Sequence, residues 1–161
     1  MRIFLSVLFA IVIAVSACTK DNIPINETSN TPIIDSVNTQ YIIYNMGNNS
    51  YVIFRPVDTL DARYFNNLSE TTISGYSFSS GISFYFKFAG NDSVGIKQLT
   101  VLYIYQGGIK YFGNSNIQIS ILQYPTSKNG YIIGSFSGTV KDTVASTVYP
   151  LQCIFKVQRD Y

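Results

Sequence analysis

Histidine and tryptophan are both absent from this chain of 161 residues. Without histidine, the chain lacks the side chain that most often serves as a general base or transition-metal ligand. Charged residues make up only 12% of the sequence, about half the usual share. The 11 basic and 9 acidic residues nearly balance, which disfavours a nucleic-acid partner or an electrostatically held membrane surface.

Cysteine is scarce as well, with Cys18 and Cys153 the two copies. Two cysteines without histidine cannot supply the ligands of a zinc cluster. Cys153 alternates with Leu151 and Phe155, so we predict that it packs as a small hydrophobic residue rather than acting as a nucleophile. The sequence therefore predicts no metal site and no cofactor.

Carboxylates are few, and Asp58, Asp61 and Glu70 are the ones that lie close together in the sequence. Such residues permit a glycosidase-like pair or a calcium loop. Their segment has the composition of a solvated turn, and the regular spacing of a calcium loop is missing. We therefore expect a protein that is not an enzyme, with a secreted hydrolase using these carboxylates as the alternative.

The chain begins with an apolar run, residues 3–15, that leads into Val15-Ser16-Ala17-Cys18. This run is shorter than the roughly 20 residues needed to span a bilayer and suits the hydrophobic part of a secretory signal peptide. Its ending resembles the lipobox of bacterial lipoproteins. The resemblance implies a signal peptide over 1–17 and an acylated Cys18 as the first mature residue. The alternative is an ordinary secretory peptide with a chance cysteine.

The residues that follow Cys18 indicate in which membrane the protein is located. Thr19 is not the aspartate that resembles an inner-membrane retention signal, which favours the outer membrane. Lys20-Asp21 is similar to the export signals of Bacteroidota surface lipoproteins, so the domain faces either the periplasm or the cell exterior. Two or three acyl chains form a stable membrane anchor. Residues 18–38, rich in Asn, Thr and Ser and interrupted by two prolines, predict the acylated terminus and a flexible tether.

From residue 39 to residue 161 the pattern is that of strands and turns. Ile82–Phe88 alternates apolar and polar residues most clearly, and Leu151–Val157 does the same. Gly107-Gly108 and Asn129-Gly130 are turn signals, and Gly47–Ser50 reads as the turn of a first hairpin. We predict an all-β domain, an antiparallel β-sandwich with a small β-barrel as the alternative.

The C-terminal part adds a resemblance to that prediction. Gly130–Val140, with its aromatic-serine-glycine pattern, precedes a last strand that ends in Val157-Gln-Arg-Asp160. Together these segments are similar to the C-terminal hairpin of small β-sandwich lipoproteins of Bacteroidota. The resemblance covers about thirty residues and implies a fold and an origin, without an activity.

Tyrosine is abundant, with 13 copies. We expect four of them to share one face of the sheet: Tyr85, Tyr103, Tyr105 and Tyr111. Tyrosines on a flat sheet can stack on sugar rings while their hydroxyls form hydrogen bonds. Alternatively, they are cross-strand pairs that stabilise the sheet.

Four of the seven aspartates begin the same three-residue pattern of aspartate, hydroxyl residue and aliphatic residue. The hydroxyl residues are Ser36, Thr59, Ser93 and Thr143. The pattern resembles the O-glycosylation sequon of Bacteroidota envelope proteins, and we expect all four sites to lie in loops. Turn preference alone explains the first two residues of each pattern, although not the third.

Taken together, these features predict a non-catalytic cell-envelope lipoprotein held in the membrane by its lipid anchor. Its domain is either a ligand- or glycan-binding module or a structural component with an envelope protein as partner. The sequence does not name the ligand.

Overall fold

The computed structural model describes residues 38–90, 92–114 and 116–160, and all regular structure in these residues is β-strand. The ten strands are β1 (Tyr41–Met46), β2 (Asn49–Phe54), β3 (Thr59–Phe65), β4 (Glu70–Ser77), β5 (Ile82–Ala89), β6 (Gly95–Gln106), β7 (Ile109–Gly113), β8 (Gln118–Gln123), β9 (Tyr131–Asp142) and β10 (Val148–Gln158). In this part of the chain, no helix has the length and hydropathy needed to cross a bilayer.

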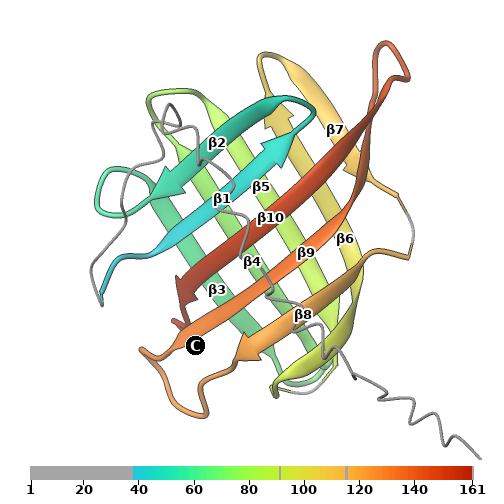
Figure 1. The fold of residues 1–161 in the computed structure, drawn as a ribbon. Coiled ribbons are helices and arrows are strands. Elements are labelled where there is room, and N and C mark those ends of the chain that lie inside the picture. Colours follow the sequence, from blue (N-terminus) through green and yellow to red (C-terminus); the bar gives the residue numbers. More distant parts are fainter. Residues whose placement is uncertain (1–37, 91, 115, 161) are drawn as a thin grey trace, which may run out of the picture. The chain divides into compact units, whose positions relative to one another are not determined.

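The strands form one continuous antiparallel sheet with the order β2-β1-β10-β9-β7-β6-β5-β4-β3. The sheet folds over on itself, so that β2, β1, β10 and β9 cross in front of β3, β4 and β5 (Figure 1). Strands β7 and β8 each pair with both of the long strands β6 and β9, which closes a small ring of four strands. The prediction of an all-β antiparallel sandwich or small barrel is confirmed.

The core lies between the two layers and is rich in aromatic rings. The ring of Phe86 in β5 lies 5.2 Å from that of Phe136 in β9 and 5.1 Å from that of Phe155 in β10. All three side chains are buried. Edge contacts of this kind add stabilisation beyond the burial of apolar area. The alternating pattern of Ile82–Phe88 therefore has the predicted orientation, with its aromatic side facing the opposite layer.

Cys153 is also part of this core and is a free cysteine. Burial raises the pKa of its thiol well above the ordinary value, since a thiolate would have to form in an apolar interior. The predicted role of Cys153 as a small hydrophobic residue is confirmed.

The segment around the clustered aspartates differs from the prediction. Residues 59–65 form strand β3, which pairs along its length with β4, so Asp61 and Thr59 belong to a strand rather than to a solvated loop. Asp58 is buried. In β3, polar residues on the outer side alternate with the buried Leu60 and Ala62. The segment was predicted to be a loop because it is short, follows Pro56 and has charged residues at its outward positions.

The first hairpin has a shorter turn than expected. Met46 pairs with Asn49, so Gly47 and Asn48 alone form the turn, and Asn49 and Ser50 already belong to β2. Gly47 has a φ of 60°, a value that glycine adopts without steric cost. Its amide donates to the carbonyl of Pro150 over 3.0 Å, which fixes the turn against β10.

Candidate functional site

The outer face of β5 and β6 carries three of the four tyrosines that we expected on one face. Tyr85 and Tyr103 are directly opposite each other, and their rings are stacked with centroids 4.7 Å apart. The ammonium group of Lys110 lies 4.8 Å from the centroid of Tyr103. Tyr85 and Lys110 therefore contact the ring of Tyr103, which a sugar would need for stacking. This part of the face is therefore a cross-strand stack, and Tyr105 is exposed beside it.

Tyr111 does not belong to this face, and its predicted placement is wrong. The two-residue turn Gly107-Gly108 pairs Tyr111 with Ile104, a core residue, so the Tyr111 side chain points inward. A turn of two residues determines which positions of a hairpin share a face. The inward side of Tyr111 could therefore have been predicted from the Gly107-Gly108 turn.

Tyr111 instead helps to form a hollow at the end of the domain where three chain segments meet. These are the β1–β2 turn, the β6–β7 turn and the start of β10, all near the top of Figure 1. The hollow has a volume of about 570 Å³, within the range of small-molecule sites. We call it the turn-end hollow, and its lining residues are Met46, Gly47, Asn48, Asn49, Tyr51, Gln106, Gly107, Ile109, Tyr111, Tyr149 and Pro150.

Aromatic rings and amide groups dominate this lining. Tyr51 stacks on Tyr44 with centroids 4.9 Å apart, and Tyr149 contacts Tyr111 edge to face at 5.9 Å. Each pair holds one half-buried tyrosine against a buried one. Fixed, partly exposed rings of this kind can contact a ligand with little loss of side-chain entropy.

Among the described residues, none that lines the hollow has a side chain that is charged at neutral pH. Burial raises the pKa of Tyr111 above its ordinary value of 10.0, and the nearby Asp142 carboxylate raises it further. The tyrosine hydroxyl therefore stays neutral. Because a buried ionic group needs a partner of opposite charge, this lining favours an uncharged polar ligand.

The hollow continues over the outer side of β1 and β10 as a second depression of about 370 Å³. The two share Gly47, Asn48, Asn49 and Pro150. The residues that belong only to the second depression are Asn45, Ser50 and Gln152, all exposed. We call this region the amide strip. It provides hydrogen-bond donors and acceptors beside the tyrosine-lined hollow.

The clustered carboxylates do not form a site together. Asp58 accepts hydrogen bonds from the amides of Phe54 and Phe78, at 3.1 and 3.2 Å, and so fixes the corner between β2 and β3. Asp61 pairs with Arg63 at 2.8 Å. Glu70, which pairs with Lys87, lies opposite Phe65, four positions along β3 from Asp61. That separation is roughly 13 Å, too large for a pair of catalytic carboxylates.

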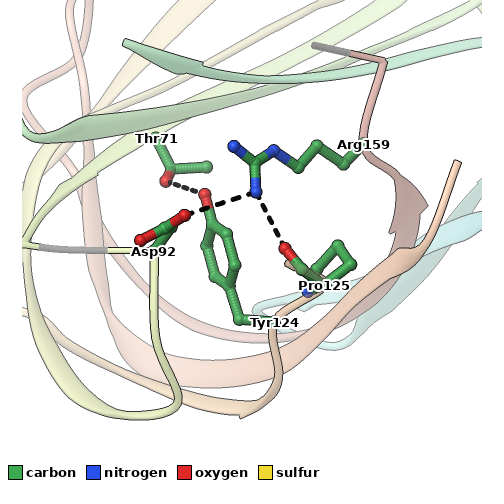
Figure 2. A network of polar contacts seen from close by, with 5 residues as sticks. All are labelled: Thr71, Asp92, Tyr124, Pro125 and Arg159. Atoms are coloured by element: carbon green, nitrogen blue, oxygen red, sulfur yellow. Dashed lines mark hydrogen bonds and ion pairs between the residues drawn. The ribbon is translucent and has the colours of Figure 1, made fainter. Parts of the chain in front are cut away.

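A polar network occupies a different region, near the C-terminal end of β10 (Figure 2). Nη1 of Arg159 donates to the carbonyl of Pro125 over 2.8 Å and lies 3.6 Å from the Asp92 carboxylate. The hydroxyls of Tyr124 and Thr71 are 2.7 Å apart and hydrogen-bonded. The network connects two loops with the end of the chain, so its contacts are those of a structural clamp. Among the described residues, no group of three or more His, Cys, Asp or Glu is placed to hold a metal ion.

The candidate modification sites differ in setting. Ser93 and Thr143 are exposed in loops, as expected, whereas the exposed Thr59 is the first residue of β3. The buried Asp142 accepts hydrogen bonds from the amides of the two residues after Thr143, which accounts for aspartate at that position. Val94 and Val144 are exposed, so core packing does not account for the third residue at these two sites, whereas Leu60, the third residue of the pattern that begins at Asp58, is buried in the core. Cys18 and Ser36 lie outside the described residues.

Apart from Tyr111, the residues that line the turn-end hollow were not predicted as site residues, although the sequence indicated two of its turns. Tyr51 and Tyr149 are nearly a hundred positions apart and meet because β10 pairs with β1, and Tyr111 joins them because β9 pairs with β7. Pairings between strands that are so far apart in the chain cannot be predicted from a local sequence pattern. Comparisons of the chain with protein families, with curated proteins and with solved structures find no match.

Proposed function

We propose that this domain is a non-catalytic glycan-binding module of a lipid-anchored cell-envelope protein. The observation that carries the proposal is the turn-end hollow, which combines tyrosine rings with amide side chains and has no charged group in its lining. Neutral sugars present the same mixture of apolar C–H surface and hydroxyl groups. A concave site with a few convergent polar groups is also the usual form of a small-ligand site.

The amide strip favours an oligosaccharide over a single sugar. It begins at the residues that the hollow shares with it and extends along β1 and β10 as far as Asn45 and Gln152. Amide side chains can both donate to and accept from sugar hydroxyls. One sugar unit would therefore occupy the hollow while the following units lie along the strip.

A binding role is also supported by the positions of the carboxylates. Hydrolysis by a pair of carboxylates requires two groups flanking the substrate at a separation of about 5–10 Å. Asp58, Asp61 and Glu70 instead make separate contacts within the sheet, and none of them lines the hollow. The hydrolase alternative has no comparable support in the structure.

The place of action in this proposal is the outer membrane. Acylated Cys18 would anchor the protein, and residues 19–38 would hold the domain away from the lipid surface, facing the periplasm or the exterior. O-linked sugars at Ser36, Thr59, Ser93 and Thr143 would add hydration to a domain that has few charges. Of the described residues among these, Thr59, Ser93 and Thr143 do not line the hollow, so modification of these three would leave the site open.

The proposal is tested by titrating the full chain, purified in detergent, with neutral oligosaccharides and measuring binding by calorimetry. Tyr149→Ala should weaken binding about tenfold, the loss expected for one stacking contact of roughly 1.4 kcal/mol. Tyr105→Ala, an exposed tyrosine on the outer face of β6, is the matched control and should bind like the wild type. The proposal fails if no neutral oligosaccharide binds, or if Tyr105→Ala is the variant that loses affinity.

A further inference from the structure

The side-chain amide of Gln106, in the turn-end hollow, is oriented by a hydrogen bond from a core residue. The Tyr44 hydroxyl donates a hydrogen bond to Oε1 of Gln106 over 3.3 Å. Tyr44 is 1% exposed and belongs to the core, whereas Gln106 is half-buried and lines the hollow. The contact therefore joins a rigid core residue to a group that a ligand can reach.

Tyr44 can act as a donor at every physiological pH. Burial raises its pKa well above the ordinary value of 10.0, and the neighbouring Tyr51 and Cys153 raise it further. The hydroxyl therefore keeps its proton. In the structure Oε1 of Gln106 faces the Tyr44 hydroxyl and accepts its hydrogen bond, so the two hydrogens of Nε2 are directed elsewhere.

The consequence is a hollow with an oriented hydrogen-bond donor. Among the described residues, no hydrogen-bond partner of Nε2 of Gln106 is found. Apolar side chains share the lining with it, including Met46 and Ile109. A ligand that satisfies both features needs a strong acceptor with a small apolar group attached to it. A carbonyl oxygen accepts without donating, and so complements an amide N–H₂ better than a hydroxyl does.

We propose that the sugar unit held in the turn-end hollow is a 2-acetamido sugar, recognised by its N-acetyl group. The acetamido carbonyl accepts a hydrogen bond from Nε2 of Gln106, and the acetyl methyl group packs against the apolar lining. Gln106 is then the residue that determines specificity, and Tyr44 is a positioning residue that acts through it. This inference rests on the proposed glycan-binding function and adds the class of sugar.

Two tetrasaccharides test the inference because they differ only at carbon 2 of each unit. Chitotetraose carries an acetamido group there, and cellotetraose carries a hydroxyl. The full chain in detergent should bind chitotetraose about tenfold more tightly, the sum of one added hydrogen bond and one buried methyl group. Calorimetric titration gives both dissociation constants, and their ratio is the quantity to compare among variants.

Two variants separate specificity from general damage to the site. Gln106→Met keeps the length of the side chain and removes the donor, so the ratio should fall from about tenfold to the few-fold preference that the buried methyl group alone contributes. Tyr44→Phe removes only the buried hydroxyl and frees the amide of Gln106 to rotate, so the ratio should fall as well, although the substituted ring would touch no ligand. Because Gln106 is half-buried at the end of a strand, Gln106→Met remains informative even if Tyr44→Phe does not fold.

The outcomes distinguish this inference from the proposed function. A wild-type ratio near ten that falls to a few-fold in Gln106→Met supports both. Binding of the two tetrasaccharides with equal affinity overturns the acetamido inference and leaves the glycan-binding function standing. A preference for chitotetraose that stays near tenfold in Gln106→Met also overturns the inference, because another group must then recognise the acetamido carbonyl. Absence of binding to either sugar, and to every other neutral oligosaccharide, overturns both.

Discussion

The carboxyl group of Asp160, beyond the end of β10, lies close to the carboxyl group of Asp61 in β3, which helps to raise its pKa. The backbone holds the two together, since Ala62 and Arg159 form a parallel bridge and the Asp160 amide donates to the Ala62 carbonyl over 3.0 Å. Two carboxyl groups in contact can share one proton but repel when both are ionised. The two groups lie where the edge strand β3 meets the segment after β10, so we expect the stability of this closure to depend on pH.

The first prediction follows from the pKa of Asp160. Burial raises this pKa above its ordinary value of 3.8, and the hydrogen bond and charge of Asp61 raise it further, against the opposing effect of Arg55 and Arg63. A raised carboxyl pKa stabilises the fold below pH 3.8, and this contribution is lost as the pH rises through the raised pKa. Asp160→Asn keeps a neutral hydrogen-bonding group at all pH values. The variant should therefore be more stable than the wild type at about pH 7.

Denaturant unfolding of the wild type and Asp160→Asn, from about pH 7 to below pH 3.8, measures the difference between their free energies of unfolding. The difference should shrink toward zero as the pH falls below 3.8. An advantage of Asp160→Asn that is the same at acid and neutral pH would show that the carboxyl pair is not the cause.

The second prediction concerns the core between the layers. Phe86→Ala removes a fully buried ring that contacts Phe136 and Phe155, and should lower the free energy of unfolding by about 3–5 kcal/mol. Ser83→Ala, on the outer side of the same strand, should change it by no more than about 0.5 kcal/mol. Denaturation midpoints of the two variants provide the comparison. Equal midpoints would contradict the register of β5.

A third prediction concerns the lipid anchor. If Cys18 is the acylated residue, Cys18→Ala should abolish both acylation and removal of residues 1–17, and should release the domain from the membrane. Cys153→Ala is the matched control, because this buried cysteine is remote from processing and its replacement should leave acylation intact. Membrane fractionation and intact mass measure both effects. A wild-type protein that carries no lipid on Cys18 would contradict the proposed anchor.

The fourth prediction concerns modification. Protein purified from its own host should carry O-linked sugars at Ser36, Thr59, Ser93 and Thr143. Ser146 and Thr147 provide an internal control, because they are exposed in the same turn as Thr143 but do not follow an aspartate. Peptide mass analysis should find them unmodified. Unmodified peptides at all four sites, or equal modification of the control residues, would leave the repeated pattern as turn chemistry alone.

Much of the fold was predictable because most strands have one buried and one outward side. Alternation in Ile82–Phe88 and Leu151–Val157 gave the correct inward residues, and glycine turn signals gave the hairpins. Strand β3 escaped prediction because Asp61 and Arg63, the charged outward residues, interrupt a short apolar pattern whose inward members include the small Ala62. Local alternation is weakest where the buried residues are small and the outward ones are charged.

The binding site was less predictable than the fold. The tyrosines of β5 and β6 share a face as expected, but Tyr85 and Tyr103 use their rings on each other. The turn-end hollow arises where the pairing of β10 with β1 brings Tyr149 near Tyr51 and Gln106. These contacts depend on the order of strands in the sheet, and a single sequence contains no signal for that order. The orientation of Gln106 depends in turn on Tyr44, which the sequence presents only as a core residue.

The central claim is that a neutral glycan binds in the turn-end hollow, and the most direct measurement is the change in backbone amide chemical shifts when chitotetraose is added to the isotopically labelled protein. We predict that the largest shifts occur at Gly47, Asn48, Asn49 and Gly107, with smaller shifts at Gln152 in the amide strip. Amides beside the Tyr85–Tyr103 stack should remain unchanged. Shifts confined to that outer face, or no shifts with any neutral oligosaccharide, would contradict the claim.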